Sequence, residues 1–460
     1  MSLPLDVARA VLAGHGAWLV GGAVRDRLLA RDTMDVDVAL DGDPRDAARE
    51  IARRAEGSAF RLSGAFGAWR VVGAGNAWHV DLVRLRDGDI EADLAARDFT
   101  INAMAEPLDG GELLDPHGGR ADLAARRLRM VSEEGLADDP LRTLRAIRLV
   151  TELDLALEPR TGAALGRHAP GLERVAAERI FGELKRIVVA PAARAGIELM
   201  EAHGVAAVVL PELPALRGVR QNEFHHADVH DHTLEVLDSV AALERDPPLG
   251  EHSAAVRELL AEPFADELTR GGAMRFAALL HDAAKPATRG IHSDERVTFV
   301  GHDAAGADLA RDVLGRLRAS QRLVAYVAAL TRDHLRLGFL VHERPLSRRA
   351  LWRYLRATDP YSADVTVFTV ADRLATRGRN AEPAIAAHLE VARAVLDEAL
   401  RGEAAPTPLV RGDELARELG VRPGPRLGAL LAQIEEDRFA GVLATREDAL
   451  RRARELLSSG

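Results

Sequence analysis

The sequence predicts an α+β protein in which a small head with a mixed β-sheet precedes a long, all-helical body. Short strand-like runs are confined to about the first 130 residues, where glycine and aspartate separate them. From about residue 132 onward, apolar residues recur at helical spacing among alanine, leucine, arginine and glutamate. The chain of 460 residues is also too long for one compact unit, so we expect several domains.

Five short segments carry the strand signal. They are Ala17–Val20, Val36–Leu40, Trp69–Val72, Ala77–Val83 and Arg127–Val131. Two proline-rich stretches, Leu210–Leu216 and Glu403–Leu409, have the composition of connectors. No repeat with a period of roughly 20 to 50 residues is present, which argues against a solenoid. We therefore expect a head at 1–130, a helical neck at 131–205, a helical domain at 206–400 and a helical tail at 401–460.

The composition excludes several classes of protein. Hydrophobic residues make up 47% and charged residues 29%, which is typical of a folded chain and not of a disordered one. No apolar run approaches the roughly 18 residues that cross a bilayer, and the first residues lack a signal-peptide pattern. The absence of cysteine excludes disulfides and thiolate metal sites. We expect a cytoplasmic protein without a membrane partner; its net charge of -10 does not exclude RNA, because a local basic face is sufficient.

A glycine turn is the first chemical signal. Gly21 and Gly22 directly follow an expected strand and precede a helix, an arrangement in which backbone N–H groups can approach a triphosphate. Arg25 falls in the first turn of that helix, where its guanidinium can meet phosphate oxygens in pairs. The turn therefore predicts a nucleotide-binding position.

A pair of carboxylates follows the turn. Asp35 and Asp37 alternate along one strand, so both side chains point to the same face and repel each other unless a cation lies between them. Mg²⁺ is the natural cation, because it is held in proteins by a few carboxylates and by substrate phosphates. Asp81, in another expected strand, is the candidate third carboxylate of a two-metal site. Each element alone is common in exposed loops, but their order is far more specific.

The motifs GGAVRD and DVD are followed by RDFTINAMA, LLDPHGGRADL, DDPLRTLRAIRLV and ERIFGELKRI. In this order the chain resembles class II tRNA nucleotidyltransferases, which share their head with bacterial poly(A) polymerases within the DNA polymerase beta superfamily. The resemblance extends to the C-terminal tail, where it implies tRNA binding. It implies Mg²⁺-dependent, template-independent addition of C, with or without A, from CTP and ATP to the tRNA 3′ end, with release of pyrophosphate. Poly(A) addition is the alternative within this family.

One helix carries groups suited to choosing a base. Asp139 and Pro140 have the pattern of a helix start, and Asp139 can accept a hydrogen bond from an exocyclic amine while Arg142 donates one to a ring nitrogen. Cytosine and adenine match this pattern; uracil and guanine do not, at about 1–3 kcal/mol per mismatch. The family assigns this role to the same two motif positions. The resemblance and the shared helix face add further nucleotide-binding candidates: Arg97, Asp98, Asn102, Arg145, Arg148 and Arg179.

The segment between Asp81 and Arg97 bears on which nucleotides are added. Family members that add the full CCA carry a flexible loop before the RDFT motif, and members that add only CC lack much of it. The segment here, LVRLRDGDIEADLAA, is short. The sequence leaves CC addition, CCA addition and A addition open, and it does not give the oligomeric state or show whether a second enzyme completes the tRNA end.

The helical body holds a second constellation. His232, His281, Asp282 and Asp372 fit the ligand order of HD-type phosphohydrolases, which assigns 206–400 to an HD domain. Imidazole and carboxylate together suit Ni²⁺, Mn²⁺, Fe²⁺ or Zn²⁺ and do not choose among them. The alternative hypothesis is a metal-dependent phosphatase or 2′,3′-cyclic phosphodiesterase, as a second activity or the main one; an HD domain can also be a packing module without metal. Two further histidines are candidates for a second ion and one lysine for a phosphate contact: His302, His334 and Lys285.

Overall fold

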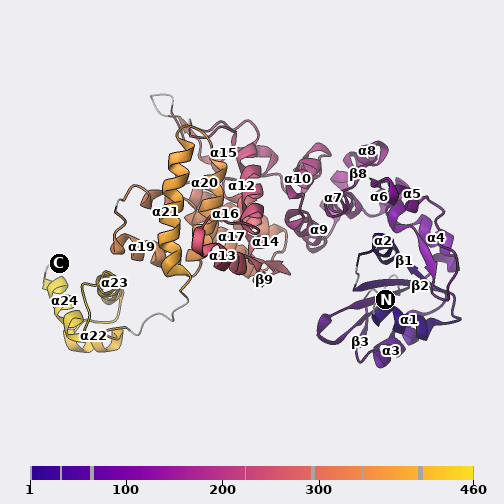
Figure 1. Ribbon diagram of the computed structural model, residues 1–460, viewed down its shortest axis with the longest axis horizontal. Helices are drawn as coiled ribbons and strands as arrows, with labels where there is room; N and C mark the ends of the chain where they lie inside the picture. Colours follow the sequence, from indigo (N-terminus) through magenta and orange to yellow (C-terminus); the bar gives the residue numbers. More distant parts are fainter. Residues whose placement is uncertain are drawn as a thin grey trace. The chain divides into compact units, whose positions relative to one another are not determined.

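The computed structural model describes residues 3–31, 34–62, 67–222, 224–291, 296–343, 345–401 and 408–458. The chain divides into two compact units, Met1–Val209 and Leu210–Gly460 (Figure 1). The first unit contains a mixed sheet and helices, and the second is almost entirely helical. The predicted fold class, a mixed-sheet head followed by a helical body, is therefore confirmed.

The sheet of the first unit has six strands in the order β3-β4-β5-β2-β1-β6. Its central pair, β2 and β5, is parallel, and all other neighbours are antiparallel. The strands are β1 (Ala17–Val20), β2 (Asp35–Leu40), β3 (Ser58–Arg61), β4 (Trp69–Val72), β5 (His79–Arg84) and β6 (Ala105–Pro107).

Alternation along β2 explains its two faces. Val36, Val38 and Leu40 are buried in a core that α1 (Leu3–Leu12) and α3 (Pro44–Arg54) cover. The intervening Asp35 and Asp37 therefore point to the opposite face, as expected from a period of two. Burial of one face fixes the register, because a slip by one residue would move both carboxylates into the core.

Four of the five predicted strands are present, and the fifth is shorter than predicted. The expected strand over 127–131 is only β7 (Arg127–Leu128), which pairs with β8 (Ala156–Leu157) in a separate two-stranded sheet. The sequence analysis missed β3 and β6. Both are edge strands, and an edge strand of three or four residues with exposed side chains or a proline leaves little alternating apolar signal.

Helices surround the sheet and continue into the rest of the first unit. Leu144 and Ile147 on α7 pack with Leu184 and Ile187 on α9 as part of a buried apolar layer. The remaining helices of this unit are α2 (Gly22–Leu28), α4 (Ile90–Ala95), α5 (Gly119–Ala124), α6 (Glu134–Asp138), α7 (Leu141–Leu153), α8 (Pro159–His168), α9 (Ala177–Val189), α10 (Ala193–Ala202) and α11 (Val205–Val209).

The second unit packs α12, α14, α17 and α20 around buried Phe276, Tyr326 and Phe368. Arg353 on α19 forms an ion pair of 2.7 Å with Glu436 on α23, which ties the last three helices to this unit. Its helices are α12 (Val229–Leu243), α13 (Ser253–Ala261), α14 (Arg270–Leu280), α15 (Lys285–Thr288), α16 (His302–Arg316), α17 (Gln321–Asp333), α18 (Arg336–Leu340), α19 (Arg348–Thr358), α20 (Ser362–Ala375), α21 (Ala381–Ala399), α22 (Gly412–Leu419), α23 (Pro425–Phe439) and α24 (Arg446–Ser458).

Two small hairpins complete this unit: β9 (Pro263–Ala265) with β10 (Leu268–Thr269), and β11 (Gly290–Ile291) with β12 (Val297–Thr298). Among the described residues of the whole chain, no helix is both long enough and apolar enough to span a bilayer.

A buried carboxylate ties three segments of the first unit together. Asp122 on α5 is fully buried and accepts hydrogen bonds from the Thr100 hydroxyl (2.7 Å), Arg127 Nε (2.7 Å) and Arg129 Nε (2.8 Å). Burial raises the pKa of Asp122, but these three donors outweigh it and hold the pKa below its ordinary value. The charged form is therefore stabilised by folding.

We predict that Asp122→Ala lowers the free energy of unfolding by about 1–3 kcal/mol at pH 7, because it leaves the buried Thr100 hydroxyl without its acceptor. The pKa of Asp122 is lower in the folded than in the unfolded protein. The stability that its charged form contributes is therefore complete above the unfolded pKa of about 3.9 and is lost as the pH falls through the folded pKa. Urea unfolding followed by tryptophan fluorescence measures the difference from the parent protein at a series of pH values.

The control for this experiment is Asp308→Ala, which removes a largely exposed carboxylate paired with Arg311 and is expected to cost less than about 0.5 kcal/mol. A difference between the Asp122→Ala variant and the parent that stays constant from pH 7 to pH 3 would contradict the account.

Candidate functional site

Three carboxylates meet on one face of the head sheet. Asp35 and Asp37 lie on β2, and Asp81 lies on the adjacent parallel strand β5 in direct register with Asp37. Asp35 is largely exposed, and its Oδ1 lies 3.0 Å from the Nδ1 atom of His79, its own register partner on β5. The structure therefore brings together the carboxylates that the sequence analysis placed in one group.

Asp37 has the most perturbed carboxyl of the three. Burial raises its pKa, Asp81 and Asp35 raise it further by repulsion, and Arg97 and Arg145 lower it, with a net value of about 6. The charged form of Asp37 is thus destabilised by burial and by the neighbouring negative charges. This is the environment that a divalent cation stabilises, and carboxylate oxygens are the ligands that Mg²⁺ prefers.

Asp81 differs from the other two because it already has a cationic partner. Arg70 on β4 is the cross-strand neighbour of Asp81 and donates from Nε and Nη2 to its two oxygens, both at 2.7 Å. The sequence analysis did not identify Arg70. No motif spacing signals it, since the contact depends on the register between two antiparallel strands.

The glycine turn between β1 and α2 lies close to Asp37. Gly21 has a φ of 67°, and a Cβ atom there would lie 2.8 Å from Arg97 Nη1 and 3.3 Å from Asp37 Oδ2. A glycine is therefore required both by the backbone conformation and by the close approach of the two side chains. Gly22 is the first residue of α2, so the predicted order of strand, glycine turn and helix is present.

A chain of hydrogen bonds and one ion pair links α2 to α7. Arg25 donates from Nη1 to the Asn102 side-chain oxygen (2.8 Å), and Asn102 in turn donates to Asp98 Oδ1 (3.0 Å). Asp98 also accepts from its neighbour's backbone N–H, and its Oδ2 lies 2.8 Å from Arg145 Nε on α7. Burial raises the pKa of Asp98, but Arg145 and these hydrogen bonds outweigh it and keep the pKa below its ordinary value.

Six of the predicted nucleotide-binding residues line one cavity of about 220 Å³. Asp139 accepts from Arg179 Nη2 at 2.8 Å and from the backbone N–H of Leu141 at 3.3 Å, so its carboxylate caps α7. Arg142 donates from Nη2 to the Ala96 carbonyl at 3.0 Å, and its buried Nη1 has no hydrogen-bond partner among the described residues. The cavity is lined by Arg97, Asp98, Asp139, Leu141, Arg142, Arg145 and Arg179.

Arg148 lies elsewhere. It is buried, its Nε is 2.6 Å from Glu183 on α9, and its Nη1 is 3.3 Å from Glu152 on its own helix. It is not among the residues that line the cavity. The spacing of three residues drifts by about 60° per step around a helix, which carries the second step from Arg142 away from the cavity and toward α9.

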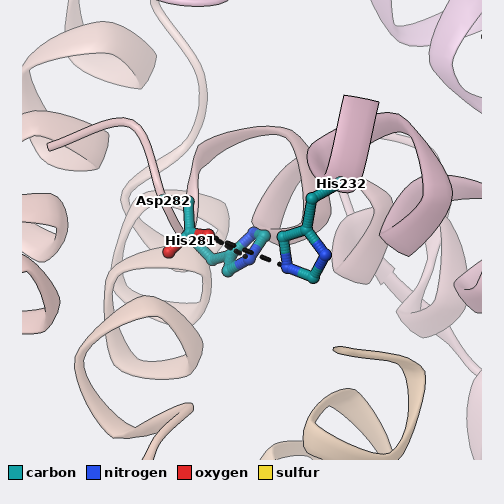
Figure 2. Close-up of side chains that lie close together, drawn as sticks. All are labelled: His232, His281 and Asp282. Carbon is teal, nitrogen blue, oxygen red and sulfur yellow. Dashed lines mark ion pairs between the residues drawn. The ribbon is translucent and has the colours of Figure 1, made fainter. Parts of the chain in front are cut away.

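A second group of side chains lies in the helical unit. Figure 2 shows the imidazoles of His232, from α12, and His281, which follows α14, with the Asp282 carboxylate beside them. The two imidazole Nε2 atoms lie 3.8 and 3.2 Å from Asp282 Oδ2. Asp372 on α20 completes the group, with Oδ1 3.1 Å from His232 Nε2. The four predicted ligands are therefore together.

The two further predicted histidines approach the other oxygen of Asp282. Nε2 of His302 and Nε2 of His334 lie 3.4 and 3.9 Å from Asp282 Oδ1. His281, His302 and His334 each donate from Nδ1 to a backbone carbonyl, at 2.9, 2.7 and 2.6 Å. Each Nε2 atom then lies within 3.9 Å of an Asp282 oxygen, and Nε2 of His302 and Nε2 of His334 are 3.3 Å apart. Such carbonyl-oriented imidazoles are typical of metal ligands, and the group fits a divalent metal.

Three neighbours of this group extend it. Lys285 Nζ lies 2.6 Å from Asp282 Oδ2 and 2.6 Å from the side-chain oxygen of Gln221. His225 stacks edge-on against His232, with ring centroids 5.2 Å apart, and burial lowers its pKa to about 3, with Lys285 and His232 contributing. Lys285 was predicted; Gln221 and His225 were not, because they precede the recognisable ligands in a segment without a motif.

Comparison with known proteins places these features in one family. Residues 17–129 match the family model described as the poly A polymerase head domain, residues 154–216 that of a probable RNA and SrmB-binding site of polymerase A, and residues 229–377 that of the HD domain. An A-adding tRNA nucleotidyltransferase of Deinococcus radiodurans is 38% identical over 94% of each chain. A CC-adding tRNA nucleotidyltransferase of Thermus thermophilus is 35% identical over 94% of this chain and 92% of that one.

Solved structures share the fold along the whole chain. The CCA-adding enzyme of Bacillus stearothermophilus in complex with CTP has a TM-score of 0.65, 24% identity and full coverage of both chains. The Thermotoga maritima CCA-adding enzyme complexed with tRNA has a TM-score of 0.63 and 20% identity, and covers 98% of this chain and 95% of that one. The chain therefore belongs to the tRNA nucleotidyltransferase family, whose head is that of the poly(A) polymerases, and it is a nucleotidyltransferase.

Proposed function

We propose that this nucleotidyltransferase adds C, and A where its substrate calls for it, from CTP and ATP to the 3′ end of tRNA, releasing pyrophosphate. The observation that carries the proposal is the pairing of Asp35 and Asp37 with a separate cavity that contains Asp139 and Arg142. The named activities of the relatives from D. radiodurans and T. thermophilus support tRNA as the acceptor. Since one relative adds A and the other CC, the number of nucleotides stays open.

In this proposal Asp35 and Asp37 hold Mg²⁺, which when bound supplies charge neutralisation for the attacking hydroxyl and the leaving pyrophosphate. Arg97, whose Nη1 lies close to the turn at Gly21 and to Asp37, contributes fixed positive charge beside the phosphates. Arg70 donates to both oxygens of Asp81, so Asp81 is the weaker candidate for a direct ligand.

Base choice follows from Asp139, just before α7, and Arg142, in the first turn of α7. The Asp139 carboxylate accepts from an exocyclic amine, and the unpartnered Nη1 of Arg142 donates to a ring nitrogen. Arg179 and the backbone N–H of Leu141 fix the Asp139 carboxylate in place before a nucleotide arrives. Such preorganised groups reject uracil and guanine because a buried donor or acceptor is left unpaired.

We assign transfer to the head at 1–130, nucleotide recognition to the neck at 131–205, and a tRNA-binding role to the tail at 401–460. RNA helices present their backbone and shape and leave few base edges accessible, so the helical parts are expected to recognise the tRNA fold and not its sequence.

Asp35→Ala and Asp37→Ala are each predicted to lower CMP incorporation into a tRNA transcript by at least about 1,000-fold, equivalent to about 4 kcal/mol of transition-state stabilisation. Because neither residue is a basic RNA contact, tRNA affinity should change by less than about twofold. Labelled-CTP incorporation and a filter-binding assay measure the two quantities.

The matched control is Asp41→Ala, which removes an exposed carboxylate directly after β2 and should leave incorporation unchanged. Retention of incorporation by either test variant would refute the assignment of the carboxylate pair.

A second activity is favoured by the carbonyl-oriented histidines around Asp282. We propose that the HD domain within 206–400 binds a divalent transition metal, such as Ni²⁺, Mn²⁺, Fe²⁺ or Zn²⁺, and acts as a phosphatase or 2′,3′-cyclic phosphodiesterase. His232, His281, Asp282 and Asp372 would hold the ion, and His302 and His334 a second one. Lys285, already beside Asp282, would contact the phosphate.

Asp282→Ala is expected to lose the bound metal, measured by elemental analysis after dialysis, and to lower hydrolysis of a nucleoside 2′,3′-cyclic phosphate by more than about 100-fold. Nucleotide incorporation by the head should be unaffected. The control Asp231→Ala, at an exposed position on α12, should keep both metal and hydrolysis. Hydrolysis that survives in the Asp282→Ala variant, or a parent protein that binds no metal, would show that this domain is a packing module.

A further inference from the structure

The head contains a second, larger cavity that the proposed reaction does not use. Its volume is about 990 Å³, and it lies between the start of α3, the edge strand β3, its neighbour β4 and the end of β5. Four of its lining residues are exposed arginines contributed by separate elements: Arg45, Arg61, Arg84 and Arg86.

The positive charge of this cavity is not balanced by its own carboxylates. Asp43 is used as the helix cap of α3, accepting from the backbone N–H of Arg45 at 2.9 Å, and Asp93 accepts from Arg97 at 2.8 Å. Unlike Arg61, which has a partner of its own, the arginines Arg45, Arg84 and Arg86 have no carboxylate within ion-pair distance in the described part of the chain. An anionic ligand with several charges along its length matches this arrangement.

An aromatic ring accompanies the arginines. Trp69 on β4 lines the cavity and is half-buried, with the Arg49 guanidinium 5.8 Å from its ring. Aromatic residues make up only 4% of the chain, so a tryptophan beside four arginines is distinctive. Arginines that follow a phosphate backbone, together with an aromatic ring on which a base stacks, are what proteins use to hold single-stranded nucleic acid.

The position of the cavity connects it to the carboxylates. Val83 and Leu85, near the end of β5, line the cavity on the sheet face that carries Asp81, whereas Arg84 projects from the opposite face. On the other side, Asp93 joins the cavity to Arg97, which lines the smaller cavity. An RNA strand whose 3′ end lies at Asp35 and Asp37 would pass around the end of β5 to place its preceding phosphates on these arginines.

We propose that this basic cavity binds the phosphates of the RNA strand that leads to the growing 3′ end. The inference rests on the proposed function and adds a second RNA contact within the head. RNA fits better than a nucleoside triphosphate for two reasons. The cavity is more than four times the volume of the nucleotide cavity, and its lining includes no pair of carboxylates on one strand face to hold a magnesium ion with the phosphates.

The test compares the double variant Arg84→Gln/Arg86→Gln with the control Arg53→Gln/Arg54→Gln in the full-length protein. The control removes the same charge from the far end of α3, where both arginines pair with Glu50 on the surface. Fluorescence anisotropy with a labelled tRNA transcript lacking CCA gives the Kd at several salt concentrations. Steady-state incorporation gives the KM for RNA and for CTP separately.

We expect the test variant to bind RNA about 3- to 10-fold more weakly. Its slope of log K against log salt should fall by about 1.4–1.8, the loss of two phosphate contacts, and the KM for RNA should rise with kcat and the KM for CTP unchanged. The control should match the parent protein. Unchanged RNA affinity and slope would refute the proposal, and a raised KM for CTP with normal RNA binding would make the cavity a nucleotide site. If the parent protein incorporates no nucleotide, the proposed function fails, while the binding measurement still decides the role of the cavity.

Discussion

The ion pair between the buried Asp98 and the partly exposed Arg145 is the interaction on which the nucleotide site depends. Asp98 follows α4 in the head and Arg145 lies on α7, so the pair fixes the helix that carries Asp139 and Arg142 relative to the sheet that carries Asp37. Removing Arg145 would leave the charge of Asp98 buried without its partner, which makes the pair costly to break from that side. The pair therefore acts as a geometric constraint that aligns transfer with base recognition.

The carboxylate group and the nucleotide cavity each contain a polar side chain in an unfavourable environment. The pKa of Asp37 is raised because burial and two neighbouring carboxylates oppose its charge, and a cation relieves that cost. Arg142 holds one buried N–H without a partner, and a base with a ring acceptor relieves that cost in turn. The helical unit gathers three imidazoles and Lys285 around Asp282. In the first unit, the fold maintains polar groups whose missing partner is the ligand.

Much of this could be predicted from the sequence because the signals were local. The alternation of Asp35 and Asp37, the turn at Gly21 and the capped start of α7 each depend on neighbouring residues, and the structure has all three. Contacts between separate elements could not be predicted from the sequence. Arg70 pairs with Asp81 on the neighbouring strand, and Arg148 pairs with Glu183 on another helix. The edge strands β3 and β6 were missed because they bury too few side chains to leave a pattern. The basic cavity was missed because its arginines are scattered over separate elements.

The central claim is that fixed protein groups, and not a template, choose the base. The most direct measurement incubates the protein with a tRNA transcript lacking CCA and an equimolar mixture of all four nucleoside triphosphates, then sequences the extended 3′ ends. Two mismatched contacts with the base at about 1 kcal/mol or more each predict that C, with A where the end calls for it, exceeds U and G by at least about 30-fold. Incorporation of U or G as readily as C would contradict the account.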